Sequence, residues 1–230
     1  MKTMIKKLLF SFLKGILAGL SIGLGGFLFI LVTTYLQDEA GKILGALVFP
    51  IGLFLICTFN LHLFTGKIGL VFEKKQEKEF YLSLPIMYIG NILGTLALGY
   101  LCFAIFKDTD LFIRATAVAE SRINFDNIGA YFACLIKAML CGMFVYFAVK
   151  AFAFDPLRPI GITLMVLSIA AFVYLGLEHC IANSFYFSFA NKWTGCSFLD
   201  LTLVTIGNAI GTLPAVYLLK LAQKQINKSE

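Results

Sequence analysis

The sequence predicts an all-α membrane protein with six transmembrane helices in a three-plus-three inverted repeat. Hydrophobic residues make up 60% of the 230 residues and charged residues only 14%, whereas a water-soluble domain is about half apolar and a quarter charged. Six long apolar segments follow one another with short polar connections, and two similar motifs recur in the two halves. We therefore predict a single transmembrane domain over 1–230, with repeat halves at about 1–106 and 128–224.

The apolar segments define the expected spans. They cover residues 15–34, 43–72, 81–106, 128–149, 159–190 and 200–219. Each has at least the ~20 residues that a helix needs to cross the hydrocarbon layer. The first segment follows a basic stretch, as in a signal peptide, but the many later segments favour a first transmembrane helix. The polar stretch between the third and fourth segments has room for a short surface helix.

The second and fifth segments are too long for one crossing. They contain 30 and 32 residues, which as continuous helices would span roughly 45–48 Å. The hydrocarbon layer needs only ~30 Å, and both segments carry polar residues near their middle. We therefore expect both helices to be interrupted at mid-membrane.

The basic residues indicate the orientation. Of 19 Lys and Arg residues, 13 flank the spans on the side of the two termini and five lie on the other side. Because cytoplasmic loops carry an excess of Lys and Arg, we predict a multi-pass protein of the inner (cytoplasmic) membrane with both termini in the cytoplasm. The net charge of +6 is thus interpreted as contact with the membrane surface, with no nucleic-acid partner.

An internal repeat connects the two halves. "GNILGTL" at 90–96 and "GNAIGTL" at 207–213 agree at five of seven positions, with an offset of 117. The same offset carries His62 onto His179, the only two histidines. Helix packing alone could explain the small residues of the motif, but not this shared offset. Since each half has three spans, the second half enters the membrane in the opposite orientation, as in many transporters and channels.

Three motifs resemble a known family. "EHCIAN" (178–183), "LFTG" (63–66) and "TIGNAIG" (205–211) are similar to signatures of the formate–nitrite transporter family, pentameric bacterial channels for small monovalent anions, and the resemblance covers nearly the whole chain. It implies an aquaporin-like fold, a homopentamer in the lipid bilayer and one pore in each protomer. It further implies transport rather than enzyme activity, with no cofactor and no metal.

The same resemblance implies roles for individual residues. The pore would contain His179, Thr65 and Asn183. The outer constriction would be Phe49, Phe64 and Phe172, and the inner one Leu53, Leu63 and Ala182. The supporting residues would be Glu178, His62 and Arg122.

Three positions depart from the family pattern. His62 stands where the family has an acid, Gly142 where it has asparagine, and Arg122 lies about four residues upstream of the usual lysine.

The chemistry of these residues suits a weak-acid anion. An unpaired charge in hydrocarbon costs tens of kcal/mol, and a proton from histidine, which titrates close to neutral pH, can remove that charge. Formate is the first expected substrate, by its frequency in the family, followed by nitrite and hydrosulfide, with passive or proton-coupled transport. Glu178 immediately precedes His179, and adjacent residues on a helix do not face each other. We therefore expect Glu178 to bond donors on another segment, because an unpaired carboxylate there is costly.

Two other functions remain open from the sequence. Two histidines on two spans could bind a b-type haem, which visible absorbance would reveal. A neutral-solute pore of the aquaporin type is disfavoured because the chain has no paired Asn-Pro-Ala motifs.

Overall fold

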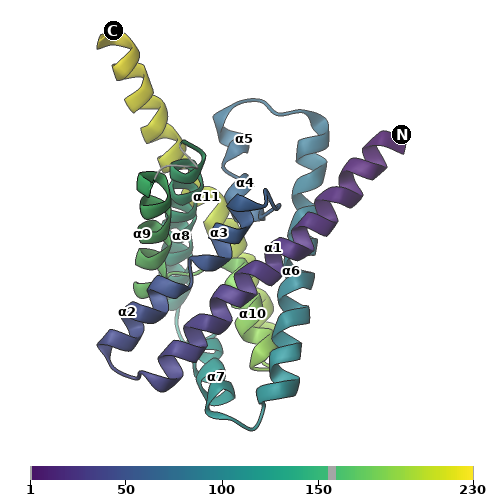
Figure 1. Ribbon diagram of the computed structural model, residues 1–230, viewed down its shortest axis with the longest axis vertical. Helices are drawn as coiled ribbons and strands as arrows, with labels where there is room; N and C mark the ends of the chain where they lie inside the picture. Colours follow the sequence, from purple (N-terminus) through teal and green to yellow (C-terminus); the bar gives the residue numbers. More distant parts are fainter. Residues whose placement is uncertain (1, 155–158, 230) are drawn as a thin grey trace.

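The computed structural model describes residues 2–154 and 159–229, and all helices and turns in these ranges form one bundle without a β-strand. The helices are α1 (Lys2–Tyr35), α2 (Glu39–Val48), α3 (Ile51–Thr58), α4 (Phe64–Lys67), α5 (Leu70–Glu73), α6 (Lys78–Phe106), α7 (Asp110–Arg122), α8 (Ile128–Phe154), α9 (Pro159–Tyr174), α10 (Cys180–Phe189) and α11 (Gly195–Ser229). The two described ends of the chain lie at the same end of the bundle (Figure 1).

The helices account for the six expected spans. Five stretches are long and apolar enough to cross a membrane, namely Met4–Tyr35, Glu39–Thr58, Lys78–Phe106, Ile128–Ala153 and Gly195–Ala222. The apolar helix α9 is shorter. The first and last helices extend well beyond the apolar segments because hydropathy reports contact with lipid, whereas a helix continues into water wherever its residues favour it.

Both overlong segments are interrupted, as their length predicted. The helix α3 ends at Thr58 and α4 begins at Phe64, while α9 ends at Tyr174 and α10 begins at Cys180. The short helix α7 lies between the third and fourth spans and packs on α10, where it buries one face.

The first half-helix of each broken span ends in the same way. Asn60 (φ +48°) and Gly176 (φ +63°) adopt the left-handed conformation that stops a helix. The N–H of Leu61 then donates to the carbonyl of Ile56 at 2.8 Å. Its counterpart, the N–H of Leu177, donates to the carbonyl of Phe172 at 3.0 Å. These bonds satisfy carbonyl groups that would otherwise be unpaired inside the membrane.

The match between the two breaks corrects the sequence-based register. Asn60 and Gly176 are 116 residues apart, as are Leu63 and His179, the residues that precede α4 and α10. His62 therefore corresponds to Glu178, and pairing the two histidines was wrong by one residue. The second half has one more residue between its break and the following "GN" motif, so the motif offset of 117 does not hold at the breaks.

The two halves run in opposite directions. The helices α1 and α6 run away from the end that carries the termini, whereas α8 and α11 run toward it (Figure 1). Each pair packs closely through glycine: a Cβ on Gly19 would lie 2.0 Å from the Asn91 carbonyl oxygen, and one on Gly142 would lie 2.1 Å from that of Asn208. The second contact leaves no room for a side chain at position 142, where the family pattern has asparagine.

Candidate functional site

His179 lies at the centre of the molecule, immediately before α10, and is 3% exposed. Its Nδ1 accepts a hydrogen bond from the backbone N–H of Ala182 at 3.1 Å. The neutral ring therefore carries its proton on Nε2, which lies 3.0 Å from the Oγ1 of Thr65. Since Thr65 is in the first turn of α4 and His179 immediately precedes α10, this bond joins the starts of the two helices that follow the breaks.

A small apolar cavity surrounds the His179 ring. It is lined by Ile22, Phe49, Leu53, Leu63, Val145, Ile169, Phe172 and His179. The volume open to water-sized molecules is about 10 Å³, room for no more than about one water. The cavity therefore has no room for a larger solute in this conformation.

Two phenylalanines close the cavity on the side of α2 and α9. The rings of Phe49 and Phe172 meet edge to face with centroids 5.8 Å apart. The Phe172 ring also stacks on the His179 imidazole, at 5.9 Å and 17°. Opening this side requires at least one ring to turn away.

The structure does not bring all the expected constriction residues together. The ring of Phe64 packs on Tyr88, with centroids 5.1 Å apart, and does not line the cavity at His179. Ala182 is buried and bonds the His179 ring through its backbone, but it lines neither that cavity nor the one beyond Leu53 and Leu63.

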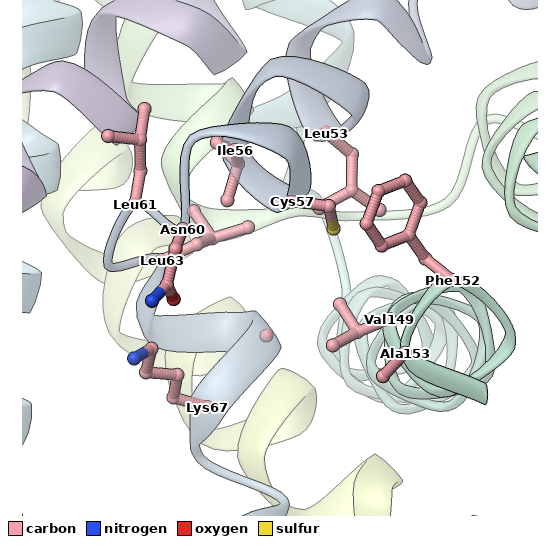
Figure 2. A pocket seen from close by; sticks show the side chains of 11 residues that line it. Leu53, Ile56, Cys57, Asn60, Leu61, Leu63, Lys67, Val149, Phe152 and Ala153 are labelled. Atoms are coloured by element: carbon pink, nitrogen blue, oxygen red, sulfur yellow. The ribbon is translucent and has the colours of Figure 1, made fainter. Parts of the chain in front are cut away.

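A second, larger cavity lies on the side of the termini. It has a volume of about 180 Å³ and is lined by Leu53, Ile56, Cys57, Asn60, Leu61, Leu63, Gly66, Lys67, Val149, Phe152 and Ala153 (Figure 2). Leu53 and Leu63 line both cavities, so their side chains form the wall between this space and His179.

A buried polar cluster holds the break between α9 and α10. The Arg122 Nη1 lies 2.9 Å from the Glu178 Oε1 and also donates to the carbonyls of Gly176 and Leu177 at 3.2 and 3.1 Å. Glu178 therefore has a partner on another helix, Arg122 at the end of α7.

Asn183 extends this cluster to a second carboxylate. Its Nδ2 donates to the Glu178 Oε2 at 2.9 Å and to the Asp200 Oδ2 at 3.0 Å. Asp200 is fully buried at the start of α11, and the sequence analysis did not select it. Its signal was a single acid within the apolar stretch "FLDLTLV", since a buried ionisable residue in a membrane is rarely without a role.

Two asparagines connect the breaks to the neighbouring helices. The Asn91 amide accepts from the N–H of Phe64 at 2.9 Å and donates to the carbonyls of Gly15 and His62 at 2.8 Å each. Asn208 makes the same three bonds, to Cys180, Ala138 and Glu178. The "GN" motifs thus supply the hydrogen bonds that the interrupted backbone lacks.

His62 lies outside the linings of both cavities. Its Nδ1 is 2.9 Å from the Ser11 Oγ, and its ring meets Phe10 edge to face. Among the described residues, no group of three or more His, Cys, Asp or Glu side chains is placed to hold a metal ion.

These features define the class of protein. Two broken helices meet near the middle of an apolar bundle, at a polar centre enclosed by hydrophobic side chains, which is the arrangement of a multi-pass membrane channel or transporter. Residues 1–222 match the family model described as Formate/nitrite transporter, and the chain belongs to this family.

Related sequences agree with this assignment. The chain is 31% identical over 213 residues to "Uncharacterized transporter YrhG" of Bacillus subtilis (strain 168), covering 86% of this chain and 78% of the relative. It is 25% identical to "Formate channel FocA" of Haemophilus influenzae, covering 90% and 84%. It is 28% identical to "Formate channel BtFdhC" of Bacillus thuringiensis, covering 86% and 80%.

Solved structures show the same fold. A "Pentameric formate channel with formate bound" superposes with a TM-score of 0.75 at 23% identity, over 100% of this chain and 99% of the other. An "FNT family ion channel" superposes with a TM-score of 0.79 at 18% identity, over 96% and 97%. The all-α channel architecture predicted from the sequence is thereby confirmed.

Proposed function

We propose that the chain conducts small monovalent anions, formate before nitrite and hydrosulfide, along a path from one side of the membrane to the other past His179. The observation that carries this proposal is His179, a polar residue in the lining of an otherwise apolar cavity, whose ring is bonded to Thr65. Two relatives named as formate channels and a structural neighbour with formate bound support formate as the first substrate.

The polar centre suits an anion that has lost its water. In the neutral form His179 donates through Nε2 to Thr65, which leaves the hydroxyl hydrogen of Thr65 free to bond an anion in the cavity. The start of α10 adds the positive end of a helix dipole. These groups offset part of the cost of bringing a charge into hydrocarbon.

Proton transfer requires a change at the His179 ring. Only the doubly protonated imidazolium can pass a proton to formate, giving formic acid and neutral imidazole. In the imidazolium Nδ1 carries a hydrogen and no longer accepts from the N–H of Ala182, so α10 loses its cap. Protonation and capping therefore exclude each other, and we propose that the ring takes up a proton only when a nearby anion compensates for the lost bond.

The proposed assembly is a homopentamer in the cytoplasmic membrane, with both termini in the cytoplasm. The excess of Lys and Arg on the side of the termini supports the orientation. The pentameric structural neighbour supports the number of subunits.

Parallel flux measurements test this function. Proteoliposomes would be challenged with formate, nitrite, hydrosulfide, lactate and chloride, with protein-free liposomes as the control for leak of the neutral acids. A pH-sensitive dye inside the vesicles separates the mechanisms, because co-transport of formate and a proton acidifies the interior. No formate flux above the protein-free control would reject the proposal.

A further inference from the structure

We propose that the cavity on the terminus side of Leu53 and Leu63 is an anion-binding site, in which the Lys67 ammonium is the cation and the Asn60 amide a second donor. Its ligand is a small monovalent carboxylate or oxyanion. The proposal rests on the proposed function for its ligand class but concerns a separate place, beyond the wall that closes the space at His179.

The fold directs Lys67 into this cavity. Lys67 is the last residue of α4, and its backbone N–H donates to the carbonyl of Leu63 at 3.1 Å. The side chain is half-buried and lines the cavity. Figure 2 shows the Lys67 ammonium and the Asn60 amide on the same side of the cavity, opposite the α8 residues Val149 and Phe152.

The cavity has a positive charge that no ion pair among the described residues compensates. The ion pairs in the described part of the chain involve the acids Glu39, Glu73, Glu120 and Glu178, and none of them includes Lys67 or Lys14. The Lys14 ammonium lies beside the site, where it donates to the Asn60 carbonyl at 2.8 Å. Two cations near one apolar cavity without an acid favour an anion as the third partner.

The inverted repeat shows that this charge is particular to one side of the pore. At the offset of 116 that relates the two breaks, Lys67 corresponds to Asn183. The Asn183 amide is held by the carboxylates of Glu178 and Asp200, and the nearby Arg122 is paired with Glu178. The cation of the second half is thus neutralised within the protein, whereas Lys67 faces an open cavity.

The site would hold an anion next to Leu53 and Leu63, the wall that the anion must pass to reach His179. An anion beside Lys67 waits within the protein until Leu53 and Leu63 separate, which raises its local concentration at the entrance. Binding from the terminus side should then be tighter than binding from the opposite side.

Direct binding tests the site without requiring transport. The dissociation constant of ¹³C-formate would be measured by NMR line broadening on the full chain in nanodiscs. We expect Lys67→Gln to weaken binding at least fivefold and Lys67→Arg, which keeps the charge, to change it less than twofold. The control is Lys75→Gln, which removes an exposed charge on the loop after α5 and should have no effect.

Sided flux tests the position of the site. Protease cleavage of a C-terminal tag would report which way the protein is inserted in the proteoliposomes. Lys67→Gln should raise the half-saturating formate concentration on the terminus side and change that on the other side less than twofold. Equal shifts on both sides, or binding by Lys67→Gln equal to that of Lys75→Gln, would overturn the inference. Binding that depends on Lys67 in a wild-type chain without formate flux would support the site and reject the proposed function instead.

Discussion

At the scale of single residues, His179 performs two tasks that can be separated by mutation. Its Nδ1 caps α10 through the N–H of Ala182 and its Nε2 contacts Thr65. Asparagine is also a good capping residue but does not titrate. A substitution can therefore preserve the fold of the break while removing the proton.

We expect His179→Asn to fold and to conduct formate with a flattened pH dependence between pH 5 and 8. His179→Phe should lose the flux, because it removes both the polar centre and a cap worth ~1 kcal/mol. The measurement is formate flux in proteoliposomes across that pH range. A wild-type pH profile in His179→Asn would show that His179 is not the proton donor.

Phe172 should form the seal at the cavity, since its ring contacts both Phe49 and His179. We predict that Phe172→Ala raises the leak of chloride and lactate severalfold, because a dry constriction excludes ions by staying dewetted. Phe64→Ala is the matched control: its ring packs on Tyr88 outside the cavity lining, so its leak should stay at the wild-type level. A larger leak in Phe64→Ala than in Phe172→Ala would contradict this prediction and assign the seal to Phe64.

Arg122 compensates the buried Glu178 carboxylate at 2.9 Å. Removing one member of a buried ion pair costs about 3–5 kcal/mol, so Arg122→Gln should strongly reduce the yield of folded protein. The double variant Arg122→Gln/Glu178→Gln should recover much of it, because no uncompensated charge remains. The melting temperatures of both variants would be measured by heating samples and recording the remaining folded protein by fluorescence-detected size exclusion. A double variant no more stable than Arg122→Gln would contradict the prediction.

At the scale of helices, the length of two apolar segments and the polar residues near their middle predicted that these two spans are broken, and hydrophobicity predicted where the spans lie. The positions of the breaks are set by Asn60 and Gly176, whose left-handed conformations end α3 and α9. Their correspondence could not be read from the motif offset, because the one-residue difference between the halves lies in a stretch without sequence similarity. The roles of Asn91 and Asn208 also needed the structure, since their partners are backbone groups that no pattern identifies.

Close packing of α8 and α11 depends on Gly142. A Cβ there would lie 2.1 Å from the backbone carbonyl oxygen of Asn208, a residue whose side-chain amide accepts from the N–H of Cys180 at the start of α10. We expect Gly142→Ala to destabilise the protein by about 1–3 kcal/mol and to lower formate flux. Gly195→Ala is the control, because a Cβ there meets no atom within 4 Å. Equal melting temperatures of the two variants would show that the helices adjust at no cost.

At the scale of the whole molecule, composition and the family motifs predicted a membrane channel. They selected His179, Phe49 and Phe172, which line one cavity, and Thr65, which contacts the His179 ring. They could not select Asp200 or Lys67, whose importance arises from what lies across the fold. From the sequence, a single charged residue in an apolar segment looks the same whether its side chain extends to the membrane surface or faces a cavity.

The proposed path past His179 predicts how mixed assemblies behave. The cavity at His179 is lined by residues of one chain, from α1, α3, α8 and α9 and the two breaks, so each protomer should conduct independently of its neighbours. If wild type and the inactive His179→Phe are mixed equally before assembly, independent pores should give about half of the wild-type flux, whereas a shared axial pore that needs five intact subunits would give about 3%. The flux should therefore rise linearly with the wild-type fraction. A steep, upward-curving dependence would place the conducting path at the symmetry axis rather than at His179.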